Sequence, residues 1–410
     1  MKRDGIWIRG LSLLMTAAIA GRIALGAASD ESSDHEIGDG RAVFVSDGYA
    51  DGTVPTSARP ADAAPAFGVS AASAILIDQT GEILYQKDPD RCLPMASTTK
   101  IMTALLAIEA GGLDREVAVP PEAVGIEGSS AYLTAGETVT METLLYALLL
   151  ASANDAATAI AILTAGSEAA FVSEMNRKAE ALGLTDTSFD NPHGLDGAGH
   201  YTTARDLSRL TARALTNETF RAIVSTERKA VPRTDTEGTR VFVNHNRLLR
   251  SYPGCVGVKT GYTKRSGRCL VTAAERDGLT LIAVTLNAPD DWRDHKAMLD
   301  YGFSVREAVP LTVDLPREIP IVGGSAESVA LTLTGPADVV LPKGDHAICA
   351  VCELRRFYYA PVGAGEILGR VIWYDGEKAV ASGTLTASET VERKPEKSFW
   401  VRFKDWLFGP

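Results

Sequence analysis

The chain has 410 residues, of which 41 are basic and 52 are acidic, so its formal net charge at pH 7 is -11. At roughly 150 residues per domain, this length predicts two or three domains with sizeable cores. Hydrophobic residues make up 45% of the chain and charged residues 23%, a composition that excludes a wholly disordered chain, collagen and a polytopic membrane protein. The acidic balance argues against nucleic-acid binding, and the 5 cysteines are too few for a disulfide scaffold.

Residues 1–28 have the pattern of a signal peptide. Basic residues within the first nine positions precede an apolar stretch at 11–20, and small residues follow at 26–28. A short N-terminal membrane helix is the alternative, but the apolar stretch is shorter than the ~20 residues that a spanning helix needs. We therefore expect the chain to be exported.

Residues 29–64 are predicted to be a flexible acidic linker. They contain mostly small and acidic residues and no sustained hydrophobic periodicity, so they cannot bury enough apolar surface to offset the entropy of ordering. Residues 40–50 alternate as a short strand would, and no prediction is made for them.

From residue 65 onward, the hydrophobic pattern is typical of a globular domain. Two hairpins are predicted, at 73–78 with 83–87 and at 268–274 with 279–286, because both pairs alternate around a glycine-containing turn. Helices are predicted from apolar spacing at 97–109, 141–150, 155–164 and 292–303. Residues 307–392 show short alternating stretches broken by glycine and proline, among them 329–333, 339–341 and 371–374, and predict a small all-β domain.

Residues 393–410 are predicted to form an amphipathic membrane-anchor helix. Phe399, Phe403, Trp406 and Leu407 follow helical spacing, and five basic residues accompany two acidic ones. A helix docked on the protein's own core is the alternative. Residues 65–392 carry the entire net charge of -11, so the part expected to touch an anionic membrane is positive while the rest is acidic.

Ser97 and Lys100 lie three residues apart at the start of the first predicted helix. This spacing places both side chains on one helix face, ~5–6 Å apart at Cβ. A serine hydroxyl becomes a nucleophile when a base removes its proton, and a buried lysine near other cations has a pKa lowered enough to be that base. Alone, the pair could equally be an N-cap serine and an ordinary helix lysine.

Two further short elements carry polar residues at predicted structural junctions. Ser152 and Asn154 lie in the bend between two predicted helices, where they could hydrogen-bond a lysine and a substrate amide, or cap a helix. Lys259, Thr260 and Gly261 lie on a predicted strand, whose edge could hold a peptide by main-chain pairing. The glycine would let a backbone approach, and a simple turn at a strand end is the alternative.

Taken together, these elements resemble the low-molecular-mass penicillin-binding proteins, the serine-type D-alanyl-D-alanine carboxypeptidases of peptidase family S11. The sequences that carry the resemblance are PMASTTKIMTAL at 94–105, SANDAA at 152–157, VGVKTGYT at 256–263, and residues 175–195 and 200–207. It is strong over 67–305 and weaker beyond. The middle element, Ser-x-Asn rather than Ser-Asp-Asn, favours this group over class A β-lactamases.

The resemblance implies an α/β fold of the β-lactamase and transpeptidase type. A mixed sheet would pack with helices beside an all-helical lobe, and the small all-β domain would follow. The catalytic domain is expected over 65–306.

The resemblance also implies roles for the motif residues. Ser97 would attack the carbonyl between the two terminal D-alanines and form an acyl-enzyme, with Lys100 as general base. Ser152 and Asn154 would relay the proton to the leaving amine and hold the substrate amide. The backbone N–H groups of Ser97 and Tyr262 would form the oxyanion hole.

The terminal carboxylate of the substrate would be bound by Lys259 and Thr260 beside Gly261, with Arg293 as a weaker candidate. The implied substrate is a peptidoglycan stem peptide ending in D-Ala-D-Ala, and β-lactams would acylate the same serine. No metal or organic cofactor is expected. The expected location is the extracytoplasmic face of the bacterial cytoplasmic membrane.

Two alternatives stay open on the sequence. A D,D-endopeptidase of peptidoglycan cross-links uses the same motifs, and a penicillin-binding protein with negligible turnover would keep them too.

The histidines and cysteines are interpreted as structural. His193 and His200 are expected to make structural hydrogen bonds, because a lysine already fills the role of the base. Cys92 is expected to contribute packing. A disulfide between Cys349 and Cys352, and one between Cys255 and Cys269, are left open.

Overall fold

The computed structural model describes residues 41–46 and 67–395. The predicted signal peptide, most of the predicted linker and nearly all of the predicted membrane-anchor helix lie outside the described residues.

The helices in chain order are η2 (Ala96–Thr99, a 3-10 turn), α2 (Lys100–Ala110), η3 (Pro121–Ala123, a 3-10 turn), α3 (Met141–Leu149), α4 (Asn154–Ala165), α5 (Glu168–Ala181), α6 (Ala204–Leu215), α7 (Glu218–Val224), α8 (Leu248–Ser251) and α9 (Asp291–Val305). The strands of the first part are β2 (Ser73–Asp78), β3 (Ile83–Lys87), β4 (Glu116–Ala118), β5 (Thr138–Thr140), β6 (Arg228–Pro232), β7 (Thr239–Val243), β8 (Cys255–Thr263), β9 (Gly267–Arg276) and β10 (Leu279–Leu286). The remaining strands are β1 (Arg41–Ser46), β11 (Arg306–Pro310), β12 (Glu318–Val322), β13 (Ser328–Thr334), β14 (Asp338–Pro342), β15 (Ile348–Arg355), β16 (Tyr358–Tyr359), β17 (Ile367–Asp375) and β18 (Lys378–Ala387).

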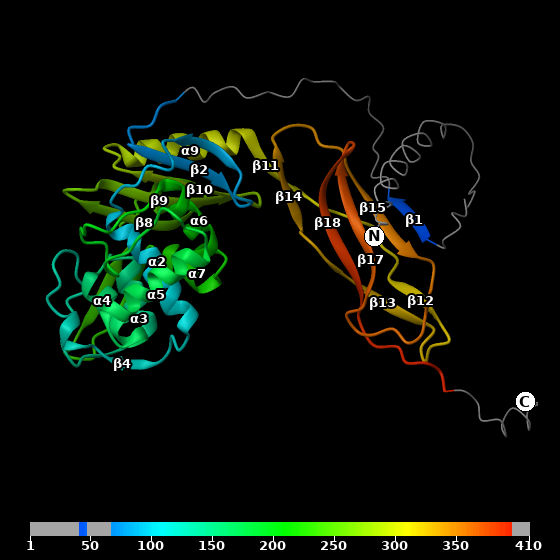
Figure 1. The fold of residues 1–410 in the computed structure, drawn as a ribbon, viewed down its shortest axis with the longest axis horizontal. Helices are drawn as coiled ribbons and strands as arrows, with labels where there is room; N and C mark the ends of the chain where they lie inside the picture. The colour runs from blue at the N-terminus through cyan, green and yellow to red at the C-terminus, as the bar shows by residue number, and fades with distance from the viewer. Residues whose placement is uncertain (1–40, 47–66, 396–410) are drawn as a thin grey trace, which may run out of the picture.

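A five-stranded sheet forms the framework of the first part of the molecule (Figure 1). Its strand order is β3-β2-β10-β9-β8, and its strand pairs are antiparallel throughout. Both predicted hairpins are confirmed as β2–β3 and β9–β10, because their short turns join strands that alternate in hydrophobicity. The strand that carries Lys259, β8, lies at one edge of this sheet, so its outer side is open to a partner.

Helices cover both faces of this sheet (Figure 1). Helix α9 lies on one face, over a hydrophobic cluster to which Leu76, Leu281 and Met298 belong. Helices α2 and α6 lie against the other, over a larger cluster that includes Ile75 and Val284. Since alternate residues of β2 and β10 point to opposite faces, each strand contributes to both clusters; β2 is buried over its whole length, and β10 is buried except at Thr280.

A helical lobe extends the larger cluster away from the sheet. Helix α3 is apolar nearly all round and buried, as predicted, and its neighbours are α2, α4 and α7. Side-chain oxygens cap four of the helices: Thr140 for α3, Ser167 for α5, Thr203 for α6 and Asn217 for α7. The predicted helices at 97–109, 141–150, 155–164 and 292–303 are confirmed, and the first of them opens as the 3-10 turn η2.

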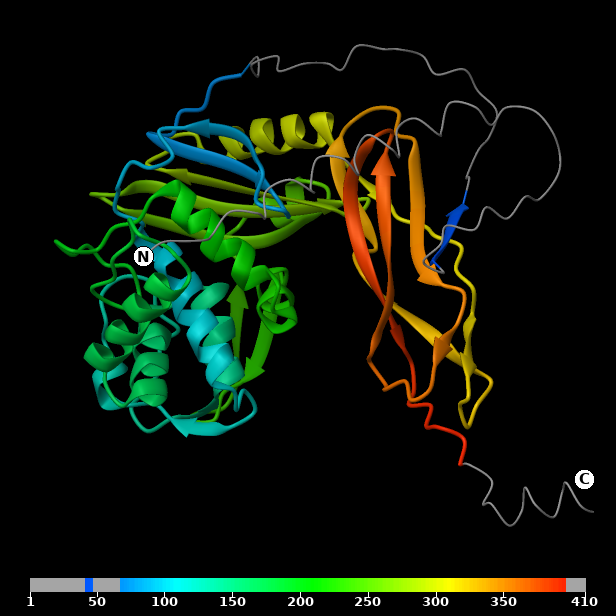
Figure 2. The same cartoon turned by 45° about the vertical axis from the view of Figure 1, so that its right-hand side comes forward.

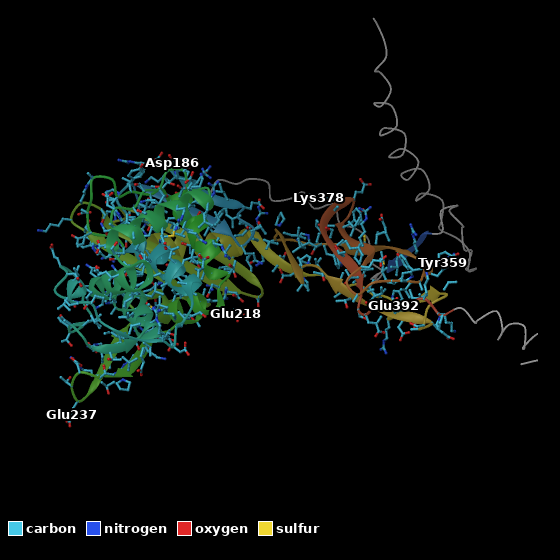
Figure 3. All side chains as sticks on the ribbon, turned by 60° about the horizontal axis from the view of Figure 1, so that its bottom comes forward. Asp186, Glu218, Glu237, Tyr359, Lys378 and Glu392 are labelled. Atoms are coloured by element: carbon cyan, nitrogen blue, oxygen red, sulfur yellow. The ribbon has the colours of Figure 1, made fainter. Side chains whose placement is uncertain are left out.

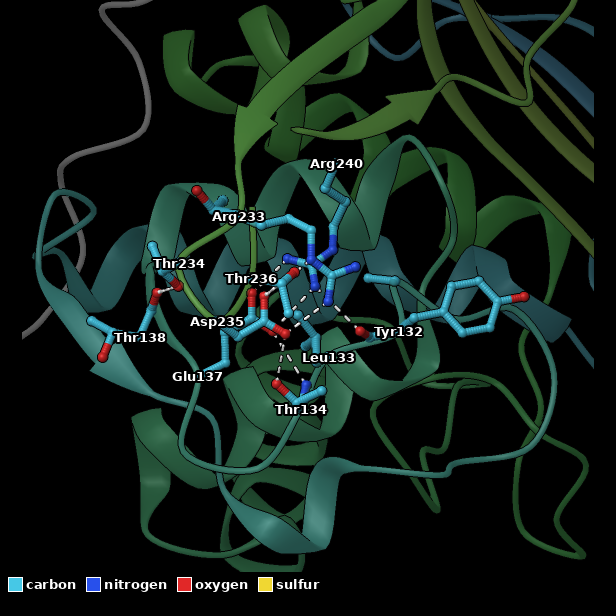
Figure 4. Close-up of polar contacts among 12 residues, drawn as sticks. Tyr132, Leu133, Thr134, Glu137, Thr138, Arg233, Thr234, Asp235, Thr236 and Arg240 are labelled. Carbon is cyan, nitrogen blue, oxygen red and sulfur yellow. Dashed lines mark hydrogen bonds and ion pairs between the residues drawn. The ribbon is translucent and has the colours of Figure 1, made fainter. Parts of the chain in front are cut away.

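The β6–β7 hairpin is joined to the loop before β5 by a polar network (Figure 4). Arg240 forms a buried ion pair with Glu137 at 2.7 Å and donates to the carbonyl of Tyr132 at 3.2 Å. At the hairpin turn, Arg233 binds Asp235, whose carboxylate also accepts from the Thr134 hydroxyl. These bonds join two segments about a hundred residues apart in the sequence.

The C-terminal part, which we call the β module (residues 306–395), supplies six strands of a seven-stranded sheet in the order β1-β15-β17-β18-β13-β12-β16, whose first strand comes from residues 41–46 (Figure 2). The predicted β stretches are confirmed as β13, β14 and β17. The module has a hydrophobic cluster of its own, centred on Trp373, whose indole N–H donates to the Thr312 carbonyl at 2.9 Å. Strands β11 and β14 pair next to the end of α9 and form the junction with the first part.

Strand β1 falls inside the segment predicted to be a flexible linker. It pairs antiparallel with β15 over its full length, from Arg41 opposite Arg355 to Ser46 opposite Ala350. Residues 41–46 are therefore ordered by a sheet edge that lies far away in the sequence.

The cysteines of the described residues are free, which settles the two pairings left open on the sequence. Cys349 and Cys352 lie on β15, where residues three apart point to opposite faces. Cys269 is opposite Gly261 in the β8–β9 register, whereas Cys255 is opposite Ala274, so those two thiols are also separated.

Within the described ranges, no single helix has the length and hydropathy to cross a membrane. Helices α4 and α5 would meet both criteria together but are bent by 85° relative to each other.

Candidate active site

Ser97 lies in η2, which leads directly into α2. The residue before it, Ala96, has a φ of +47°, a left-handed conformation that is unfavourable for a residue with a Cβ. Two hydroxyls hold this turn: Thr98 donates to the Met95 carbonyl at 2.6 Å and Thr99 to the Ala96 carbonyl at 2.8 Å. Strain of this kind persists where surrounding contacts over-determine the backbone, and it clusters at active sites.

Lys100 is fully buried, and its ammonium nitrogen lies among three polar atoms. Nζ is 3.0 Å from Ser97 Oγ, 2.7 Å from Asn154 Oδ1 and 2.5 Å from the carbonyl oxygen of His193. The spacing in the sequence predicted the contact with Ser97, and the structure adds partners from two other segments. These contacts aim the nitrogen at the serine hydroxyl.

Electrostatics favour the neutral form of this lysine. Burial lowers the pKa of Lys100 well below its usual value, the positive charge of Lys259 lowers it further, and Asp155 opposes the shift. Among the described residues, no acidic side chain forms an ion pair with Lys100. A neutral amine at 3.0 Å can accept the proton of the Ser97 hydroxyl.

Asn154 and Ser152 lie in the predicted bend between α3 and α4. The Asn154 amide nitrogen donates to the Glu127 carbonyl at 2.5 Å while its oxygen faces Lys100, so the side chain is fixed at both ends. Ser152 has a φ of +59°, again a left-handed residue with a Cβ. Its hydroxyl makes no hydrogen bond within the described residues and is available to a substrate.

The third element lies on the open edge of the sheet, beside Ser97. A Cβ added to Gly261 would be 3.0 Å from the backbone nitrogen of Ser97, so only glycine lets the strand come this close. Lys259 is 1% exposed, and burial lowers its pKa to about 7. Tyr262, the next residue after Gly261, is exposed. The edge of β8, the Ser97 backbone and two buried lysines therefore meet at one place.

The structure adds a loop over residues 190–199, whose role the sequence did not reveal. The Asn191 side chain accepts from the backbone N–H of Gly194 at 2.7 Å and of His193 at 3.3 Å, and donates to the Leu195 carbonyl at 2.9 Å. A Cβ at Gly194 would overlap the Ala96 carbonyl. This loop thus holds the His193 carbonyl against Lys100. In the sequence, this loop was marked by the resemblance of residues 175–195 to the family.

The structural interpretation of the two histidines is confirmed. The Asp190 N–H donates to His200 Nδ1 at 2.9 Å, so the ring proton lies on Nε2, which is 2.7 Å from the Thr99 hydroxyl. His193 Nδ1 accepts from the Leu195 N–H at 3.2 Å. Burial lowers the pKa of His193 to about 3 and that of His200 to about 4, so both rings are neutral at neutral pH.

Arg293 forms no hydrogen bond or ion pair with Ser97, Lys100 or Lys259 among the described residues. It lies on α9, its side chain is 79% exposed, and its guanidinium is 3.6 Å from Asp290. Helix α9 packs on the sheet face opposite α2 and α6, whereas Ser97 is joined to α2. The proposed role of Arg293 as a weaker candidate for binding the substrate carboxylate therefore stays a prediction.

A metal site does not emerge from the described residues, in which no three His, Cys, Asp or Glu side chains are grouped to hold an ion. The arrangement is that of a serine nucleophile with an amine base.

Comparisons with known proteins agree with this geometry. Residues 58–290 match the family model described as Peptidase_S11, D-alanyl-D-alanine carboxypeptidase. The chain is 33% identical over 357 residues to D-alanyl-D-alanine carboxypeptidase DacF of Bacillus subtilis, covering 82% of this chain and 91% of the relative. It is 32% identical over 222 residues to a D-alanyl-D-alanine endopeptidase of Pseudomonas aeruginosa, covering 53% and 71%.

A solved structure gives the same result for the fold. The DD-transpeptidase of Streptomyces K15 superposes with a TM-score of 0.56 at 34% sequence identity, and the match covers 58% of this chain and 98% of that one. This confirms the fold class predicted for the first part of the molecule. The chain belongs to the peptidase S11 family of serine D-alanyl-D-alanine carboxypeptidases.

Proposed function

We propose that the protein removes the terminal D-alanine from peptidoglycan stem peptides through an acyl-enzyme on Ser97. The observation that carries this proposal is the buried Lys100 amine, which lies 3.0 Å from the Ser97 hydroxyl and whose pKa burial lowers well below its usual value. Ser97 Oγ bonds to the carbonyl carbon, Lys100 takes the hydroxyl proton, and the bond to the terminal D-alanine breaks as its amine gains a proton. Water then hydrolyses the ester and regenerates the serine.

The other motif residues bind and orient the substrate in this proposal. The backbone N–H groups of Ser97 and Tyr262 stabilise the oxyanion, because Gly261 brings the strand edge next to Ser97. Lys259 and Thr260 bind the terminal carboxylate. A buried cation with no acidic partner among the described residues gains most from such a ligand, which would also raise its pKa again.

Ser152 and Asn154 complete the site. The free Ser152 hydroxyl relays the proton to the leaving amine, and the Asn154 side chain holds Lys100 in position. β-Lactams, as mimics of the terminal dipeptide, acylate the same serine.

The test uses the full chain and a pentapeptide ending in D-Ala-D-Ala, and follows D-alanine release together with binding of a labelled penicillin. Ser97→Ala should abolish both, since among the described residues Ser97 Oγ is the hydroxyl within hydrogen-bond distance of Lys100 Nζ. Ser173→Ala, which changes an exposed serine on α5, is the matched control and should retain both activities.

The alternatives predict different results in the same assay. A cross-linked peptide dimer cleaved faster than the pentapeptide would favour the endopeptidase. Penicillin binding without D-alanine release would mean negligible turnover and would overturn the carboxypeptidase proposal.

We also propose that the protein acts at the extracytoplasmic face of the bacterial cytoplasmic membrane. The support is in the sequence: an export-signal pattern at residues 1–28, and an aromatic and basic C-terminus whose helical spacing fits a membrane interface. The contribution of the C-terminus is measured by the tail deletion in the vesicle experiment below.

A further inference from the structure

The end of the β module farthest from the active site carries exposed aromatic side chains. Phe357 is 44% exposed and Tyr359 is 70% exposed, with their rings 5.4 Å apart and edge to face. Val322, 47% exposed, is opposite Tyr359 in the parallel pairing of β12 and β16. In Figure 3, Tyr359 and Glu392 are labelled at the end of the module that points away from the catalytic part. Apolar groups exposed side by side indicate an interaction site.

Basic side chains surround these aromatic groups. Arg355 and Arg356 precede Phe357 directly and are exposed. The Lys394 N–H donates to the Gly323 carbonyl at 2.9 Å, which places this exposed lysine beside Val322. We call Val322, Arg355, Arg356, Phe357, Tyr359 and Lys394 the tip surface. Exposed Glu392 offsets part of its positive charge.

The chain continues from this surface into its most aromatic segment. The described residues end at position 395, one residue beyond Lys394. Residues 396–410, EKSFWVRFKDWLFGP, then hold three phenylalanines and two tryptophans among basic residues. A tail lying on a bilayer must therefore start at the tip surface, so the bilayer and the tip surface would be brought together.

We propose that the tip surface is a second lipid contact, which meets an anionic bilayer beside the tail. Aromatic rings are favoured at the depth of the headgroups, and the arginines and the lysine match lipid phosphates. The β module would then stand on the membrane with its far end at the lipid, instead of hanging from the tail. The inference rests on the proposed membrane location and does not depend on the chemistry at Ser97.

Attachment to the bilayer through both the tip surface and the tail would differ from attachment through the tail alone. A single weak anchor gives marginal and reversible binding, whereas two signals give stable attachment. A tail alone also leaves the module free to rotate about position 395. A tip that touches lipid fixes its direction, and with it the height of the active site above the membrane.

The experiment compares full-chain proteins on vesicles of phosphatidylglycerol and phosphatidylcholine in a 1:3 ratio and on phosphatidylcholine alone. The test variants are Phe357→Ser/Tyr359→Ser and Arg355→Glu/Lys394→Glu. Matched controls are Val243→Ser, an exposed apolar residue on β7, and Lys378→Glu, an exposed lysine that Figure 3 places on the β module away from Tyr359. A chain without residues 397–410 measures the contribution of the tail.

The partition coefficient should fall about tenfold for each test variant on the anionic vesicles. The controls should match the unaltered chain, and the Glu substitutions should have little effect on phosphatidylcholine alone. A lipid with a diazirine near the headgroup should label peptides that contain residues 355–359 as well as the tail.

The possible results separate the proposals. If only the tail were labelled and both test variants partitioned like the unaltered chain, the proposed lipid contact of the tip surface would be overturned. The tail would then remain as the anchor. Labelling of neither would overturn the membrane location as well. The chain could instead form a dimer in the absence of vesicles. If Phe357→Ser/Tyr359→Ser abolished that dimer, the tip surface would be assigned to contact with a second copy of the chain.

Discussion

At the scale of single residues, the site depends on two buried lysines, of which Lys259 lowers the pKa of Lys100. Lys100 and Lys259 are both almost inaccessible to solvent, and the charge of one lowers the pKa of the other. The pairing gives each a separate role. Lys100 is driven toward its neutral form, as a base requires, while an anionic substrate bound at Lys259 would favour the charged form of that lysine.

Lys259→Met should therefore move the pH profile of acylation as well as reduce the rate. Loss of the positive charge removes one of the influences that lower the pKa of Lys100, so that pKa rises and more of the amine is protonated at a given pH. We expect the acidic limb of the penicillin acylation rate to move to higher pH, and kcat/KM for the pentapeptide to fall about 100-fold. Stopped-flow acylation between pH 5 and 10 is the measurement.

Lys264→Met is the matched control, because Lys264 lies on the same hairpin but is exposed. Its profile should coincide with that of the unaltered protein. An acidic limb that stays in place in Lys259→Met, or moves to lower pH, would show that Lys259 does not tune the base.

At the scale of structural elements, the site is assembled from segments that other contacts hold in place. The loop at 190–199 is closed on itself by Asn191, and the segment before β5 is held by Asp155 and Arg240. Asp155 accepts from the N–H groups of Ala131 and Leu133 and from the Ser130 hydroxyl, one residue after the Asn154 that binds Lys100. The bend after α3 therefore fixes both the base and the neighbouring loop.

The ion pair between Arg240 and Glu137 should be essential to the attachment of the β6–β7 hairpin (Figure 4). Arg240→Met leaves the Glu137 carboxylate buried without its partner, which should lower the free energy of unfolding by about 3–5 kcal/mol. Arg240→Met/Glu137→Leu removes both charges and should recover most of that loss. Urea unfolding followed by circular dichroism measures the three proteins.

Arg233→Met serves as the control at the same hairpin, since its pair with Asp235 is at the surface and should contribute little. If the double variant were no more stable than Arg240→Met, an uncompensated charge would not be the cause of the loss.

At the scale of the whole molecule, the two sheets have separate hydrophobic clusters and meet at the β11–β14 pair. The junction is a two-stranded ribbon that follows α9 directly, and from it Ala308 and Val340 pack against the cluster under α9. This separation predicts that the β module can lose stability while the site stays intact.

Trp373→Ala tests this independence. The indole is buried at the centre of the module, so its removal should lower the stability of that module by about 3–5 kcal/mol. Calorimetry should show one transition that moves to lower temperature and another that does not, and the rate of penicillin acylation at 25 °C should be unchanged. A single transition that moves as a whole would mean that the two parts unfold together.

Much of this organisation could be predicted because it is local. Hairpins, the apolar α3 and the pairing of Ser97 with Lys100 follow from spacing within a few residues, and such spacing acts through the backbone geometry of one element. The resemblance to the peptidase family added which of these local elements meet. The sequence thus determined the fold class, the order of the elements and the nucleophile with its base.

The tertiary structure decided what depends on distant segments. The partners that aim Lys100 lie 54 and 93 residues away, and β1 is ordered by a strand near the other end of the chain. The role of Arg293 stays a prediction, because spacing along the chain does not show how near the start of α9 lies to the substrate carboxylate. Likewise, alternation along residues 319–359 does not show that Val322 and Tyr359 share a surface. Long-range packing decides such questions, because a side chain acquires its neighbours and its electrostatic environment only when the chain has folded.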